Sequence, residues 1–143
     1  MRTKFETPII VLGARLLSPY IMLLGLYVIF HGHYSPGGGF QGGALLASSI
    51  LLMRLSAGAK ATNLQIKEWV TQPMSAIGVL IYFGTGLAAV IAGGYFLDYE
   101  MLPFGLEAAY LRNTGILIIE VGIGLAVMGV LVMIFDNMVR GED

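Results

Sequence analysis

Residues 8–30 read PIIVLGARLLSPYIMLLGLYVIF, a strongly apolar run with a single charged side chain, Arg15. An α-helix rises about 1.5 Å per residue, so roughly 20 apolar residues cross the ~30 Å hydrocarbon core of a bilayer. Pro8 suits the first helical turn, where its missing N–H costs nothing, and the hydroxyl of Thr7 can cap the helix. The run predicts a membrane-spanning helix, and it is longer than the apolar core of a cleaved signal peptide.

Three further segments reach the same length, at residues 36–55, 74–97 and 114–135. Pro73 precedes the third of these segments, and Asn113 precedes the fourth as a capping residue. Only 12% of the 143 residues are charged, about half of the ~25% that is usual for soluble domains. The sequence therefore predicts an all-α integral membrane protein with four transmembrane helices (8–30, 36–55, 74–97 and 114–135), which form a single transmembrane domain over residues 1–143.

The second of these helices depends on where it begins. Its strictly apolar part is short, from Ala44 to Met53. Ser35 followed by Pro36 is a helix-start signal, and counting from Pro36 extends the segment enough to span. This start places most of a glycine cluster inside the first two helical turns, namely Gly37, Gly38, Gly39, Gly42 and Gly43.

Positive charges in the connecting segments predict the orientation, because lysine and arginine are retained on the cytoplasmic side. One side of the predicted helices carries a single basic residue, Arg112. The other side carries Arg2, Lys4, Arg54, Lys60, Lys67 and Arg140. Both termini are therefore expected to be cytoplasmic.

Composition also excludes several classes of function. There is no cysteine, which excludes thiolate metal sites, iron–sulfur clusters and cysteine nucleophiles. The net charge of −1 argues against a nucleic-acid partner, which needs a clustered basic surface. No nucleophile–base pair or metal-ligand cluster is evident in the sequence. We expect no cofactor, no metal and no independent enzymatic activity.

Small residues at regular spacing mark three of the helices as contact surfaces, because membrane helices associate through close packing. Each such stripe fits packing within the chain or against a partner subunit, and the spacing alone does not distinguish the two. The stripes are Gly39, Gly43 and Ala47 on the second helix, Gly84, Ala88 and Ala92 on the third, and Gly115, Gly122 and Gly129 on the fourth.

Two ionisable residues, Arg15 and Glu120, lie inside predicted helices. A charge at such depth costs several kcal/mol unless it is paired or hydrated, so each is a functional candidate. Their predicted heights differ by roughly 8 Å at 1.5 Å per residue, which an arginine side chain nearly bridges. A structural ion pair, Arg15 reaching toward the headgroups, and Glu120 lying beside a cation path are the alternatives.

His31 and His33 flank Gly32 at the end of the first helix. Imidazole can relay protons near neutral pH, which makes both residues candidates for an ion path. The pair alone supplies too few ligands for a specific metal site. Hydrogen bonding at the membrane interface is the simpler role.

The glycine cluster is costly, because each glycine in a helix interior loses about 1 kcal/mol relative to alanine. Either another backbone approaches closely here, or the first turn is unwound beside a contact. Phe40 would project from this turn as an anchor, and Gln41 could bond to exposed backbone. The segment lacks the ending of a phosphate-binding loop.

Residues 31–43, HGHYSPGGGFQGG, closely resemble the signature of the B subunit of Mrp (Mnh-type) multisubunit sodium/proton antiporters. The resemblance extends over essentially the whole chain. It implies an accessory subunit of the bacterial cell membrane, assembled with about seven kinds of Mrp subunit in a complex that exchanges Na+ for H+. It also implies that Pro36 and Phe40 are functional positions.

Two alternatives to this interpretation remain open. One is the equivalent subunit of a membrane-bound hydrogenase or a related redox-driven ion-pumping complex, because such complexes contain Mrp-like modules. The other is a free-standing scaffold or small channel.

Overall fold

The computed structural model describes residues 7–32, 34, 37–58, 67–105 and 107–140. Its helices are α1 (Pro8–His31), α2 (Gly39–Ala57), α4 (Glu68–Ile91), the short 3₁₀-helix η1 (Tyr99–Met101) and α5 (Ala108–Arg140). Four of them contain a stretch long and apolar enough to cross a membrane. The predicted all-α fold with four candidate spans is confirmed for this part of the chain, whereas the cytoplasmic placement of the termini stays a prediction.

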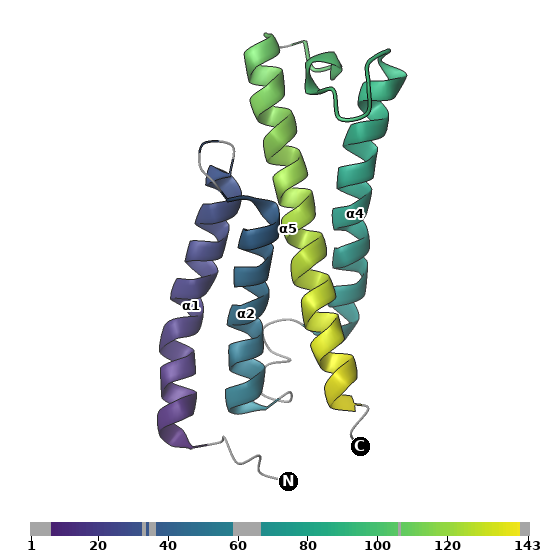
Figure 1. Cartoon of the computed structure of the whole chain (residues 1–143). Coiled ribbons are helices and arrows are strands. Elements are labelled where there is room, and N and C mark those ends of the chain that lie inside the picture. The colour runs from purple at the N-terminus through teal and green to yellow at the C-terminus, as the bar shows by residue number, and fades with distance from the viewer. Residues whose placement is uncertain (1–6, 33, 35–36, 59–66, 106, 141–143) are drawn as a thin grey trace.

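The four long helices lie in a row rather than in a closed bundle (Figure 1). The order along the row is α1, α2, α5, α4, and α1 contacts α5 only slightly. Among the described helices, α1 and α4 do not touch. The start of α1 and the end of α5 lie on the same side of the molecule, at the lower ends of the helices in Figure 1. Each half is thus a helical hairpin, and the contact between α2 and α5 joins the two halves.

The start of α2 corrects the sequence prediction. The helix begins at Gly39 and not at Pro36, which lies outside the described residues. Gly37 has φ +158°, which residues with a side chain rarely adopt, and Gly38 is extended. The first two glycines of the run therefore belong to the turn before α2, because their backbone is not helical. At the other end, Gly58 has φ +79° and follows the last helical residue, Ala57.

The bounds of α4 and α5 also differ from those predicted. α4 begins at Glu68 rather than residue 74, so Pro73 lies inside the helix, and it ends at Ile91 because Gly93 turns the chain with φ +95°. α5 begins at Ala108 rather than residue 114, and its 33 residues span about 50 Å at 1.5 Å per residue. This length exceeds a hydrocarbon core of about 30 Å, so α5 extends beyond it.

Glycines permit the close contacts along the row. Gly42 faces Gly25 between α2 and α1, Gly43 faces Gly124 between α2 and α5, and Gly78 faces Gly122 between α4 and α5. The main hydrophobic cluster lies where α1, α2 and α5 meet and consists of Ile29, Leu46, Ala47, Ile50, Met128 and Val132.

The small-residue stripes of the second and fourth predicted helices are thus used within the chain. Gly39 and Gly43 face α5, and Gly122 and Gly129 face α4. The stripe on α4 is different, because a Cβ added at Gly84 would meet no atom within 4 Å. This part of α4 is open to lipid or to another protein.

Candidate functional site

The glycine signature forms the connection between α1 and α2. The end of α1 is closed by two backbone hydrogen bonds: Gly32 donates to the Ile29 carbonyl at 3.4 Å, and Tyr34 donates to the His31 carbonyl at 2.9 Å. At the start of α2, the Gly42 N–H donates to the Gly38 carbonyl at 2.9 Å. The described glycines of this connection lie where α5 passes beside it.

Glu120 of α5 reaches directly into this connection. A Cβ added at Gly32 or at Gly38 would lie closer than 3.0 Å to the Glu120 carboxylate. A Cβ at Gly39 would come equally close to the Glu120 backbone carbonyl oxygen. Real Cβ atoms essentially never show such contacts. Only glycine fits at Gly39, where the facing atom is backbone, whereas a side chain at Gly32 or Gly38 would require the end of the Glu120 side chain to move. We call the set of Gly32, Gly38, Gly39 and Glu120 the glycine cradle.

The cradle places a carboxylate within a membrane protein against bare backbone. Its Oε2 atom is buried, with less than 1 Å² of accessible surface. The charge of such a group strongly depends on its surroundings, because burial penalises the ionised form. The two candidates that the sequence treated separately, Glu120 and the glycine cluster, are therefore one site.

Tyr99 of η1 lies on the α4 side of α5, one to two turns from the cradle. Its ring covers Gly115, where an added Cβ would lie 2.5 Å from a ring carbon. Burial raises the pKa of Tyr99, and the charges of Tyr82 and Glu120 raise it further. Sequence reasoning did not single out Tyr99 or Tyr82. The stripe position Gly115 was the only signal that a ring would pack there.

Arg15 does not pair with Glu120, so the structural ion pair, one of the three alternatives for these residues, is wrong. Arg15 is exposed on α1 and lines a cavity of about 260 Å³ beside Ser18 and Met22. Glu120 instead lies at Gly32, 17 residues further along the chain and roughly 25 Å away at 1.5 Å per residue. The ion pair assumed that the first and fourth helices end level with each other. α5 instead extends beyond the end of α1 (Figure 1), so Glu120 lies level with that end and far from Arg15.

The histidines and the residues beyond the glycines have different surroundings. The His31 ring is exposed and stacks on Tyr27 with ring centroids 4.7 Å apart. His33 lies outside the described residues. Phe40 is 67% exposed. Gln41 is also exposed, and its side-chain oxygen lies over Gly37 in the turn before α2. Within the described part of the chain, no cluster of three or more potential metal ligands is present.

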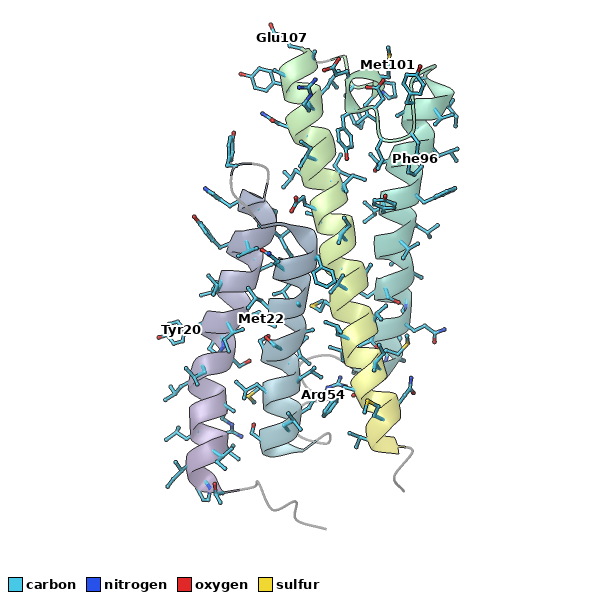
Figure 2. The ribbon with its side chains drawn as sticks, viewed as in Figure 1. Tyr20, Met22, Arg54, Phe96, Met101 and Glu107 are labelled. Atoms are coloured by element: carbon cyan, nitrogen blue, oxygen red, sulfur yellow. The ribbon has the colours of Figure 1, made fainter. Side chains whose placement is uncertain are left out.

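A buried ion pair joins α2 and α5 near their C-terminal ends, far from the cradle. Arg54 bonds to Asp136, and their side chains are only 2% and 10% exposed. Figure 2 shows the labelled Arg54 between these two helices. In the sequence, Arg54 counted only as a basic residue of the cytoplasmic side, and Asp136 was not singled out. Arg54 lies in the last turn of α2, which ends at Ala57, and its side chain packs against α5.

Comparison with known proteins supports one family. A family model described as a domain related to the MnhB subunit of Na+/H+ antiporters matches residues 9–133. The chain is 32% identical to the Na+/H+ antiporter B subunit of Alkalihalophilus pseudofirmus, over 80% of this chain and 84% of that protein. The corresponding antiporter protein of Bacillus subtilis is 30% identical, over 81% and 86% of the two chains.

Two longer proteins are also similar. An uncharacterized protein of Methanocaldococcus jannaschii is 37% identical, over 64% of this chain but only 34% of that protein. A chain in the structure of the membrane-bound sulfane sulfur reductase, an archaeal respiratory membrane complex, matches with a TM-score of 0.73 and 32% identity. That match covers 96% of this chain and 60% of the other, so this chain corresponds to a part of each longer protein.

Proposed function

This chain belongs to the family of proteins related to the MnhB subunit of Na+/H+ antiporters, and from that premise we propose that it is an accessory membrane subunit of a multisubunit Na+/H+ antiporter. It acts within a hetero-oligomer of other Mrp antiporter subunits in the cell membrane. The complex exchanges Na+ for H+, and the chain itself is no independent enzyme.

The observation that carries this proposal is the glycine cradle. The family signature, residues 31–43, supplies Gly32 and Gly38, which pack against the Glu120 carboxylate of α5, and Gly39, which packs against the Glu120 backbone. A carboxylate inside a membrane protein marks an ion pathway by default, because keeping it there is costly. The signature therefore supports a role in the exchange of cations, and not only in folding.

The surface of the row supports assembly with other subunits. The open face at Gly84 and the exposed Phe40 leave contact surfaces that the chain does not use itself. Small residues and aromatic anchors are typical of contacts between membrane helices and between subunits. In this proposal the positive charges near both termini keep them cytoplasmic.

A second candidate is the equivalent subunit of a redox-driven membrane complex. The observation in its favour is the similarity to a chain of an archaeal respiratory complex over 96% of this chain. The antiporter assignment fits better, because the relatives that match in length are antiporter subunits. Purification of the complex from native membranes distinguishes the two: iron–sulfur or hydrogenase-like subunits would identify the redox complex.

The test of the antiporter proposal is exchange in everted membrane vesicles, with a pH-sensitive dye as reporter. We expect Na+-dependent proton movement to disappear when the gene is deleted and to return with the wild-type chain. Glu120→Gln should impair exchange while the subunits still co-purify, and the control Glu100→Gln should not. Full exchange without the chain, or exchange by the purified chain alone in liposomes, would refute the proposal. Single-channel currents from the isolated chain would instead identify a free-standing channel.

A further inference from the structure

The space around the Glu120 carboxylate limits what it can bind. A Cβ at Gly32 or Gly38 would overlap the carboxylate, so the two glycine α-carbons already lie at van der Waals contact with it. A metal cation needs several oxygen ligands at bonding distance around itself, and these contacts leave no room for such a shell on that side. A proton adds no heavy atom and needs no shell.

The groups around the cradle are arranged unevenly. His31 and Tyr34 lie on either side of Gly32 in the chain, and the exposed Glu100–Arg112 ion pair is held at Arg112, eight residues before Glu120 on α5. α2 contributes glycine backbone to the cradle. Glu120 and Tyr82 both interact electrostatically with Tyr99.

Tyr99 lies nearer than Glu120 to the end of the molecule that carries η1, on the α4 side of α5. Its ring is half-buried over Gly115, five residues before Glu120 on α5. The nearby Glu100–Arg112 pair is exposed, with side chains 45% and 62% accessible. Tyr99 is therefore the described side chain of η1 that interacts electrostatically with Glu120.

From this geometry we propose that Glu120 is a proton-binding site of the complex, which exchanges its proton with the η1 end of the molecule past Tyr99. The proposal rests on the chain being part of an antiporter. Glu120 takes up one proton and releases it again, so no further reactant is required. Tyr99 is a positioning residue, whose hydroxyl places a polar group on the route.

The experiment treats the purified whole complex with dicyclohexylcarbodiimide, a lipid-soluble reagent for protonated carboxyl groups in apolar surroundings. The carboxylic acid adds across the carbodiimide and rearranges to a stable N-acylurea, which mass spectrometry locates. The chain contains two matched controls: Asp136, buried and paired with Arg54, and Glu100, exposed and paired with Arg112. We expect Glu120 to be labelled at least tenfold more than either control. The extent of labelling should fall as pH rises and should not depend on Na+.

Tyr99→Phe tests the route, because it keeps the ring over Gly115 and removes only the hydroxyl. A polar hydroxyl favours the ionised carboxylate, so its loss should move the pH of half-maximal labelling upward by about half a unit. A purely structural role for the ring predicts no shift, and that result would remove Tyr99 from the proposal. The control Tyr95→Phe changes a tyrosine that is 86% exposed and should leave the profile unchanged.

Two results would overturn the proton site. In the first, Glu120 is labelled no more than Asp136, and the infrared pH-difference spectra of the parent and of Glu120→Gln show the same carboxylic C=O bands. The other is protection of Glu120 by Na+, which would make it a ligand of the metal cation. Neither result depends on exchange activity, so a failure of the antiporter proposal is recognised separately in the vesicle assay.

Discussion

Gly43→Ala tests the close contact between α2 and α5 that joins the two hairpins. An added Cβ would lie 2.6 Å from the Gly124 carbonyl oxygen and 3.0 Å from the Val127 Cβ. These atoms are backbone or the root of a side chain, so they cannot swing away. The two helices would have to separate by roughly 0.5–1 Å to restore ordinary contact at both atoms, because non-bonded heavy atoms pack best at about 3.5–4.0 Å.

The expected change in the free energy of unfolding follows from two opposing contributions. Alanine in place of a helical glycine gains up to about 1 kcal/mol, whereas forcing an extra methyl into a packed contact costs about 1–3 kcal/mol. Gly84→Ala is the matched control, because Gly84 lies inside α4 and an added Cβ there meets nothing within 4 Å. The gain from replacing a helical glycine by alanine is the same in both variants and therefore cancels in the comparison. We expect Gly43→Ala to be less stable than Gly84→Ala by about 1–3 kcal/mol.

The assay is unfolding of the purified chain in bicelles by increasing dodecyl sulfate, followed by circular dichroism. Both variants and the parent are measured under identical lipid conditions, because the reference state is unfolded chain within lipid. Equal stability of the two variants would refute the reasoning, since it would mean that α2 and α5 do not approach as closely as the glycines indicate.

Three further predictions concern charged and titratable groups. Arg54→Met should destabilise the chain by about 3–5 kcal/mol because it leaves Asp136 buried without its cation. The double variant Arg54→Met with Asp136→Leu should recover most of this loss in the same unfolding assay, and an equal loss of stability in both variants would contradict a pairing role. Burial raises the pKa of Tyr99 above its ordinary value of about 10, so its neutral form stabilises the fold below pH ~10 and this stability disappears as pH rises through the raised value. The tyrosinate difference spectrum between the parent and Tyr99→Phe should show that Tyr99 ionises at higher pH than the exposed tyrosines. Ionisation at the same pH would count against burial. Arg112→Gln should change stability by less than about 1 kcal/mol, because its pair with Glu100 is exposed, and a larger loss in dodecyl sulfate unfolding would show that the pair is structural.

Much of the fold was predictable because hydrocarbon imposes length and hydropathy on any helix that crosses it. The number of long helices followed from this constraint, as did most of the α1 span. The bounds were less accurate where the sequence carried competing signals. Pro73 looked like a helix start but lies inside α4, and Asn113 looked like a cap but lies inside α5. Apolar composition does not reveal how far a helix continues beyond the membrane.

The candidate site was only half predictable. The cost of the glycines and the depth of Glu120 marked each as unusual, since both are unfavourable without compensation. Their proximity was not predictable, because the offset between helices in a row depends on which side chains interlock. The same uncertainty produced the wrong Arg15–Glu120 pair and concealed the Arg54–Asp136 pair.

The sequence by itself determined that residues 8–30 and three further segments would be helices in lipid, and that the signature after the first helix needs glycine. The tertiary structure alone decided what that signature packs against. Hydropathy acts on each helix separately, whereas the register of α5 against the α1–α2 hairpin depends on contacts between residues far apart in the chain. That register brings Glu120 onto Gly32 and Gly38, where a side chain would displace the carboxylate from its present position.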